Sequence, residues 1–133
     1  MTGPAVASWG AGVDSTAMII ELESRGEPPD LVLFADTGAE YPETYAYIPI
    51  FRQWLDDRHI PFEIVRYTPT RLNGKPAYAT LLEDLLASKT LPAIAFGQHS
   101  CSLKWKIAPQ TRALEQWQPA KNAWAHGKTV TRL

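Results

Sequence analysis

The sequence contains a single cysteine, Cys101, and only three histidines. One cysteine excludes an internal disulfide, a four-cysteine zinc site and an iron–sulfur cluster held by four thiolates of this chain. His59, His99 and His126 lack the short spacings of metal-binding histidines. The low cysteine content fits a reducing compartment, and we expect no iron–sulfur cluster and no histidine-based metal site.

The sequence also lacks an excess of one charge and any long apolar run. Its formal net charge is −1, so no overall basic field indicates nucleic acid as a partner. The longest apolar runs, such as Leu31–Ala35, are far too short to cross a bilayer, and the N-terminus has no basic segment followed by an apolar one. We therefore expect a cytoplasmic protein without membrane association.

The 133 residues have the length and composition of one globular domain, with 45% hydrophobic and 20% charged residues. In the first half, apolar strand-like runs alternate with stretches of helical periodicity. In chain order these are a strand at Ala5–Trp9, a helix from Asp14 to Arg25–Gly26, a strand at Leu31–Ala35, a helix from Tyr47 to Arg58 and a strand at Phe62–Val65. This order predicts a three-layer α/β domain over residues 1–133, with a mostly parallel, Rossmann-like sheet.

Other boundaries are less sharply marked. Pro49 falls within the second helical pattern, so we expect either a kink there or a helix that starts close to it. Further helices are expected at 79–87 and from about Pro109 to Trp117, whereas 91–100 has mixed character. The last residues, Lys128–Leu133, alternate like the start of a strand. Either the domain is truncated at its C-terminus or an edge strand ends it.

A glycine-rich segment, Ser8–Thr16, lies between the first strand and the first helix, at the end where parallel α/β sheets bind ligands. Small residues let a phosphate approach the backbone, and the first helical N–H groups with the helix dipole attract anions. The hydroxyls of Ser8, Ser15 and Thr16 can add donors. The segment is neither a Walker A loop nor a dinucleotide-binding fingerprint. The alternative is a tight turn without a ligand, in which Asp14 or Ser15 is the helix N-cap.

Three segments carry a family resemblance. Ser8–Thr16 resembles the pyrophosphate-binding (PP) loop of the adenine nucleotide alpha hydrolase superfamily, whose pattern is Ser-x-Ser-Gly-Gly-x-Asp-Ser/Thr. Phe34–Thr44 resembles the second segment of the phosphoadenosine phosphosulfate reductase branch, and Cys101–Pro109 is similar to its Cys-Thr-x-x-x-Lys-x-x-Pro stretch. The loop departs from the pattern where many relatives have serine, glycine and lysine, at Gly10, Ala11 and Val13. The likeness is therefore to the broad reductase-like and phage-encoded group.

The resemblance implies a HUP-type nucleotide-binding domain with one of two ligands. In the ATP version, the loop holds the β and γ phosphates, Mg²⁺ offsets their charge, and an acceptor attacks the α-phosphorus with release of pyrophosphate. In the sulfonucleotide version, the ligand is phosphoadenosine phosphosulfate, and Lys106 and Arg112 bind its extra phosphate. The reductases use a cysteine in a C-terminal tail, which this sequence does not show. Complete sulfonucleotide reduction by these residues alone is therefore not expected.

The resemblance also implies a set of site residues. The expected nucleotide-binding residues are Ser8, Trp9, Gly10, Ala11, Gly12, Asp14, Ser15 and Thr16 in the loop, Asp36, Thr37 and Gly38 after the second strand, and Lys104, Lys106 and Arg112 in the third segment. The candidate catalytic residues are Cys101, Lys106 and Asp14. Trp9 and Trp105 either belong to the core or stack on adenine.

The acidic candidates have structural alternatives. Asp36 either positions Mg²⁺ or a ribose hydroxyl, or makes local bonds in a turn before Gly38. Glu40 and Glu43 are interpreted as helix-entry acids that complement the helix dipole.

The basic segment also allows more than one interpretation. Lys104, Lys106 and Arg112 either face bound phosphates or are solvated surface charges. Basic neighbours favour the thiolate of Cys101, and the alternative is a buried, inert cysteine. The leading hypothesis is an enzyme acting on ATP or a sulfonucleotide. Its rivals are a non-catalytic nucleotide-binding module, completed by a partner protein or a missing C-terminal segment, and a redox protein centred on Cys101. The sequence is compatible with a homo-oligomer and does not decide the oligomeric state.

Overall fold

The computed structural model of the chain describes residues 2–68, 78, 80–89 and 103–133. Its elements are, in chain order, β1 (Thr2–Ser8), α1 (Val13–Ser24), β2 (Leu31–Asp36), α2 (Pro42–Asp57), β3 (Phe62–Arg66), α3 (Leu81–Ser88), the π-helical turn η2 (Leu103–Ile107), α5 (Ala108–Gln116), α6 (Gln118–Ala125) and β4 (Thr129–Arg132). The mixed segment 91–100 and Cys101 lie outside the described residues.

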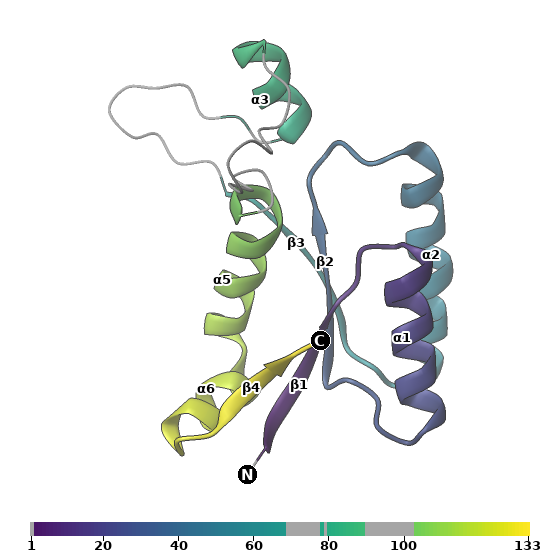
Figure 1. The fold of residues 1–133 in the computed structure, drawn as a ribbon, viewed down its shortest axis with the longest axis vertical. Coiled ribbons are helices and arrows are strands. Elements are labelled where there is room, and N and C mark those ends of the chain that lie inside the picture. The colour runs from purple at the N-terminus through teal and green to yellow at the C-terminus, as the bar shows by residue number, and fades with distance from the viewer. Residues whose placement is uncertain (1, 69–77, 79, 90–102) are drawn as a thin grey trace.

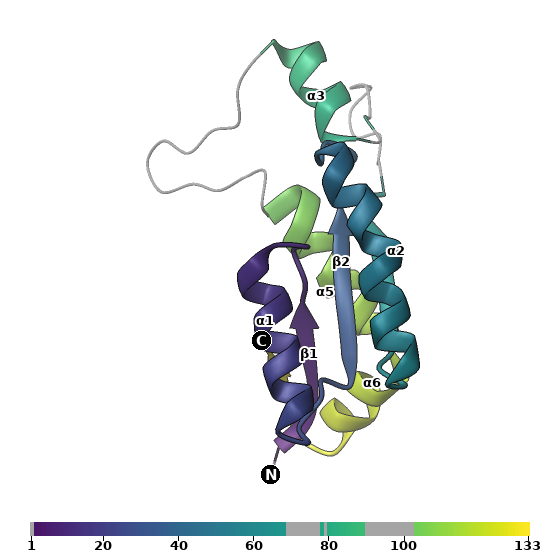
Figure 2. The ribbon, with the colours of Figure 1, turned by 90° about the vertical axis from the view of Figure 1, so that its right-hand side faces the viewer.

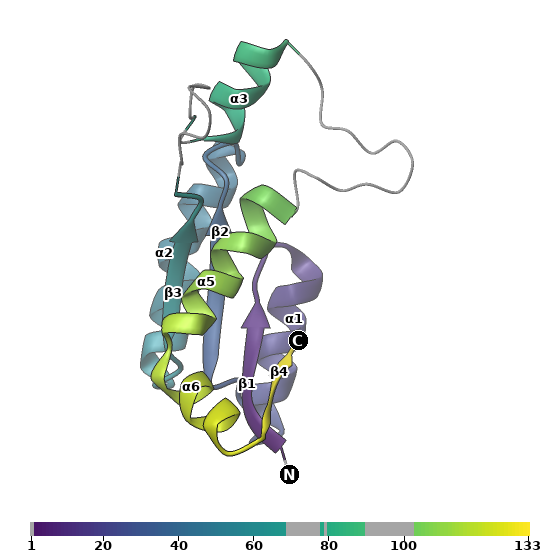
Figure 3. The same cartoon turned by 90° about the vertical axis from the view of Figure 1, so that its left-hand side faces the viewer.

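The four described strands form one sheet in the order β3-β2-β1-β4, and every pair is parallel. Helices α1 and α2 cover one face, and α5 and α6 cover the other (Figure 1). Figure 2 shows α1 and α2 in front of the strands, and Figure 3 shows α5 and α6 from the opposite side. The predicted three-layer α/β fold with a parallel sheet is confirmed.

Alternate residues of the central strands supply two cores, one on each face. Leu31, Leu33 and Ala35 pack with Leu114 of α5, whereas Val32 and Phe34 pack towards the α1 and α2 face. Every residue of β2 is buried, as a strand between two helical layers must be. This explains why the β2 sequence is apolar without alternation.

The boundaries of the first two helices differ from the prediction. Helix α1 begins at Val13 with Gly12 as its N-cap, so the expectation of Asp14 or Ser15 as N-cap is wrong. Helix α2 begins at Pro42 and runs through Pro49, so the expected start near Pro49 is wrong too. Pro42 occupies a first-turn position, where its missing N–H costs nothing. Pro49 is exposed on the helix, and buried residues before and after it hold the helix against the sheet.

The later elements agree with the prediction in part. Helix α3 and the start of α5 near Pro109 are confirmed, and the strand at the end of the chain is β4, an edge strand beside β1. Helix α6 was not expected; it follows Trp117, whose extended backbone separates it from α5. None of the helices in the described ranges has the length and apolar character needed to cross a membrane.

Candidate functional site

The carboxyl ends of the strands bring together the segments that the sequence singled out. The loop after β1, the turn after β2 and the last residue of β3 all lie at or directly after the carboxyl ends of their strands, which point upwards in Figure 1. The strand order reverses between β1 and β4, where the Ser8 N–H donates to the Leu133 carbonyl at 3.1 Å. Open α/β sheets bind ligands outside the strand ends at such a reversal. The loop after β1 therefore occupies the expected ligand position.

The loop is held by its own backbone and by one serine. The Trp9 N–H still donates to the Leu33 carbonyl of β2 at 2.8 Å, which ties the start of the loop to the sheet. The Gly10 N–H donates to Ser15 Oγ at 3.2 Å, so Ser15 links the loop to the first turn of α1. Ala11 takes a left-handed backbone conformation with φ of 58°. Contacts within the chain thus set the shape of the loop.

Gly10 and Gly12 are not required by the fold. Neither has φ in the left-handed region, and a Cβ added to either would meet no heavy atom of the described chain within 4 Å. Ala11, by contrast, adopts the conformation that favours glycine. Glycine therefore occurs at the two loop positions where the chain itself has room for a side chain.

The first turn of α1 presents unpaired donors. The N-cap Gly12 has no side chain to accept a hydrogen bond, and among the described residues no acceptor contacts the N–H groups of Val13, Asp14 and Ser15. The side chain of Asp14 is exposed and has no partner in the described part of the chain. These N–H groups form the positive end of the helix dipole, which suits an anion.

The three hydroxyls of the loop differ in availability. Ser8 is exposed, and its hydroxyl has no hydrogen-bond partner among the described residues. Thr16 is buried, donates to the Gly12 carbonyl at 2.7 Å and accepts from Trp9 Nε1 at 2.8 Å. Its only hydroxyl proton is therefore used, and the expectation that Thr16 donates to a phosphate is wrong. Thr16 instead fixes the geometry of the loop.

The two tryptophans expected as adenine-stacking candidates are both core residues. Trp9 and Trp105 are each 1% exposed. Trp9 stacks on Phe51 with ring centroids 4.6 Å apart, and Trp105 packs against Tyr67 at 4.8 Å. The stacking role is wrong for both, because neither indole face is open to a ligand.

Asp36 is enclosed by its own chain. Its Oδ1 accepts from the Gly38 N–H at 2.9 Å and from the Tyr45 hydroxyl at 2.8 Å, and its Oδ2 contacts Nε and Nη2 of Arg66, each at 3.0 Å. The bond to Gly38 is the local turn contact that was the structural alternative. Burial raises the pKa of Asp36, but the hydrogen bonds from Gly38, Tyr45 and Arg66 and the charge of Arg66 outweigh it and hold that pKa below its ordinary value. Burial and the hydrogen bond to Asp36 raise the pKa of Tyr45.

In the part of the chain that the structure describes, Asp36 is not suited to hold a magnesium ion. Both oxygens of Asp36 already accept from the chain, and a cation at Oδ2 would have to displace Arg66. No group of three or more His, Cys, Asp and Glu side chains in the described ranges is placed to hold a metal ion.

Thr37 and Gly38 hold α3 rather than face an open site. Thr37 is 3% exposed, its hydroxyl donates to Glu40 at 3.2 Å, and its carbonyl accepts from the Leu81 N–H at 2.8 Å. Gly38 has φ of 73°, and a Cβ there would lie 2.5 Å from Cγ2 of Thr80, the N-cap of α3. Tight packing against α3 therefore explains the glycine at position 38.

The third segment is only partly described. Lys106 in η2 and Arg112 in α5 are exposed, and both belong to the layer opposite α1 and α2. Cys101 and the side chain of Lys104 lie outside the described residues. Glu43 is in the first turn of α2, as expected for a helix-entry acid, and Glu40 precedes that helix.

Arg66 was missed by the sequence analysis. It is the last residue of β3, and its side chain is 71% exposed although it is paired with the buried Asp36. The sequence signal was weak, because a cation after a short apolar run is usually a solvated strand end. Only the parallel pairing of β2 with β3, with Asp36 opposite Arg66, brings the two side chains together.

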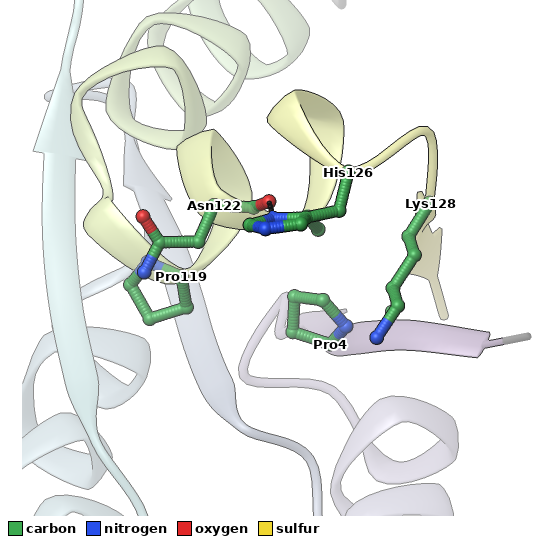
Figure 4. A pocket seen from close by; sticks show the side chains of 7 residues that line it. Pro4, Pro119, Asn122, His126 and Lys128 are labelled. Carbon is green, nitrogen blue, oxygen red and sulfur yellow. Dashed lines mark hydrogen bonds between the residues drawn. The ribbon is translucent and has the colours of Figure 1, made fainter.

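A pocket of about 460 Å³ adjoins the loop. It lies beside the start of α1, and its lining is mostly apolar: Ala11, Gly12, Val13, Thr16, Ala17, Ile20 and Tyr47. A smaller pocket of about 330 Å³ lies at the amino end of β1, where the side chains of Pro4, Pro119, Asn122, His126 and Lys128 surround it (Figure 4). The first pocket is the one that the glycine loop borders.

Comparison with known proteins gives no match: no family model, no curated protein and no solved structure corresponds to this chain. The resemblance to the phosphoadenosine phosphosulfate reductase-like family therefore stays a prediction from the three sequence segments.

Proposed function

We propose that the chain binds an adenine nucleotide through its phosphate chain, at the loop Trp9–Gly12 and the first turn of α1. The observation that carries this proposal is the pair Gly10 and Gly12, which the fold does not require. A phosphate lying against the backbone would account for both, because a Cβ at either position would occupy the space of its oxygens.

The surroundings of the loop support the proposal. The unpaired N–H groups of Val13, Asp14 and Ser15 can donate to phosphate oxygens, and the exposed Ser8 hydroxyl can add a donor. The adjoining pocket has a size common for small-molecule sites, and its apolar lining suits an uncharged ring. Both the anionic and the apolar part of a nucleotide would thus find a complementary surface.

We further propose an enzymatic role of the reductase-like kind, supported by the three-segment resemblance. In the ATP version, an acceptor forms a bond to the α-phosphorus, the bond to the β-phosphate oxygen breaks, and pyrophosphate leaves with the electron pair. The N–H groups of the first turn of α1 would stabilise the charge on the departing pyrophosphate through their fixed positions. In the sulfonucleotide version, a cysteine thiolate from outside these residues forms a bond to the sulfuryl sulfur, the bond from that sulfur to the phosphate oxygen breaks, and phosphoadenosine phosphate leaves with the electron pair.

Binding without turnover is the second candidate function, and one observation favours it. Val13 is 85% exposed in the first turn of α1, where many of the resembled proteins have a lysine. Without that cation, a developing charge on the phosphate chain is less well stabilised. In this candidate, a partner protein supplies the missing groups.

Calorimetric titration with ATP plus Mg²⁺, and separately with phosphoadenosine phosphate, tests the proposal. We expect the wild-type chain to bind one of them, and Gly12→Ala to weaken that binding at least tenfold. The same substitution should cost under about 1 kcal/mol in stability, because its backbone is ordinary and its surroundings are open.

Gly26→Ala is the matched control. Gly26 lies at the other end of α1 and has φ of 75°, and a Cβ added there would meet no heavy atom of the described chain within 4 Å. This control should lose stability through backbone strain but keep nucleotide affinity. Absence of binding to the wild-type chain, or equal affinity of Gly12→Ala and wild type, would contradict the proposal. Release of pyrophosphate from ATP would separate the enzyme from the binding module.

A further inference from the structure

Arg66 is unusual among the described arginines because its partner is buried. Its Nε and Nη2 both contact Oδ2 of Asp36 at 3.0 Å, and Asp36 is 9% exposed. Arg25 and Arg58, in contrast, pair with glutamates on exposed helix surfaces. The carboxylate beneath Arg66 cannot swing away, because Gly38 and Tyr45 hold its other oxygen. The guanidinium is therefore anchored along one edge, on a carboxylate that is itself held in place.

Most of the donors of Arg66 remain open. A guanidinium has five N–H donors, and the two contacts with Asp36 leave three without a partner in the described part of the chain. Because Asp36 offsets the positive charge of Arg66, we expect these donors to recognise an anion by directed hydrogen bonds at short range rather than by long-range attraction. A fixed planar donor group of this kind is suited to the oxygens of a phosphate, sulfate or carboxylate.

Arg66 lies on the same end and the same face of the sheet as the proposed nucleotide site. Along β3 it has the orientation of Phe62 and Ile64, which pack on the α1 and α2 side. Arg66 is the last residue of β3, and β2 lies between β3 and β1 in the sheet. The axes of β3 and β1 are therefore about 10 Å apart. Lys106 and Arg112, by contrast, belong to the opposite helical layer.

We propose that Arg66 binds a second anionic group of the nucleotide, the one farthest from the glycine loop, and that Asp36 positions Arg66 for this contact. The inference rests on the proposed function, since the loop must hold the first anionic group. The shared chemistry is a phosphoryl or sulfuryl group, either at the end of the 5′ chain or on the ribose. Asp36 acts through Arg66 and is a positioning residue.

Titrations with AMP, ATP and phosphoadenosine phosphate on wild type and Arg66→Met test the inference. We expect Arg66→Met to weaken binding at least tenfold for the ligand that carries the second group, and less than twofold for AMP. A loss confined to ATP assigns the contact to the 5′ chain, and a loss confined to phosphoadenosine phosphate assigns it to the ribose phosphate. Arg66→Lys should restore less than a third of the lost affinity, because a point charge does not reproduce the planar donors.

Two further variants separate recognition from stability. Arg66→Met leaves Asp36 without its cation, so Asp36→Asn combined with Arg66→Met should regain stability without regaining ligand selectivity. Arg58→Met, at the opposite end of β3, is the matched control and should leave every affinity unchanged. If wild type binds a nucleotide and Arg66→Met binds all three ligands within twofold of it, the inference is wrong while the proposed function stands. If wild type binds none of them, both fail.

Discussion

The loop after β1 and the turn after β2 have similar compositions, but their polar groups differ in how many partners they have within the chain. Both contain small residues, hydroxyls and an aspartate at the carboxyl end of a buried parallel strand. In the turn, Asp36, Thr37 and Gly38 are fully committed to Arg66, Tyr45 and α3. In the loop, the Ser8 hydroxyl, the Asp14 carboxylate and three helical N–H groups have no hydrogen-bond partner in the described chain. The comparison teaches that residue type alone does not distinguish a segment whose polar groups hold its own chain from one whose polar groups are left over for a ligand.

The largest expected effect is on the turn. Gly38→Ala should destabilise the protein by about 3 kcal/mol, from backbone strain plus overlap of the new Cβ with Thr80. Gly26→Ala has similar φ but open surroundings, so it should cost only about 1 kcal/mol. Chemical denaturation of both variants measures the difference. Equal losses would show that α3 does not pack on Gly38.

A smaller effect concerns the charge of Asp36. Because its folded-state pKa lies below the ordinary value, Asp36 contributes stability that is fully present above its unfolded pKa and is lost as pH falls through the folded pKa. At pH 7 we expect the free energy of unfolding of wild type to exceed that of Asp36→Asn by about 1 kcal/mol. The difference is small because Arg66, the cation paired with Asp36, is largely exposed and its charge is screened by solvent. This advantage should shrink as pH falls below about 4.

Unfolding free energies of wild type and Asp36→Asn at pH 7, 5, 4 and 3 check this expectation. A difference between the two that does not change over this range would show that the charge of Asp36 contributes nothing to the turn.

The smallest effect concerns the shape of the loop. Ala11 has φ of 58°, so Ala11→Gly should relieve strain and stabilise the protein by up to about 1 kcal/mol. Thermal unfolding measures this change, and Ala17→Gly in the interior of α1 is a control that should destabilise by about the same amount. Destabilisation by Ala11→Gly would mean that the loop is not held in the left-handed conformation.

Most of the fold could be predicted from sequence because its central strands are buried on both faces. The apolar run Leu31–Ala35 is short and is rich in residues that favour strands, which indicates a strand buried on both faces, and Gly26 and Pro28 after α1 are clear end signals. Helix α6 was missed because it buries only Ala120 and Ala123, which produce no recognisable apolar periodicity.

The candidate site was predictable in position but not in detail. The loop between β1 and α1 follows from local patterns, since its strand, glycines and helix are adjacent in the sequence. The enclosure of Asp36 is not local, because Arg66 lies 30 residues away and meets it only through the register of β2 and β3. Likewise, the Thr16 hydroxyl accepts a hydrogen bond from the indole of Trp9, and no sequence pattern indicates that this indole points towards Thr16.

The most direct test of the central claim is the amide ¹H–¹⁵N spectrum of the labelled chain during titration with ATP or phosphoadenosine phosphate. We predict that the amide signals of Val13, Asp14 and Ser15 shift most, because their unpaired N–H groups would donate to the phosphate. Signals of the opposite pocket, such as those of Asn122 and His126, should stay in place. Saturable shifts around Asn122 and His126, with the loop unchanged, would contradict the account.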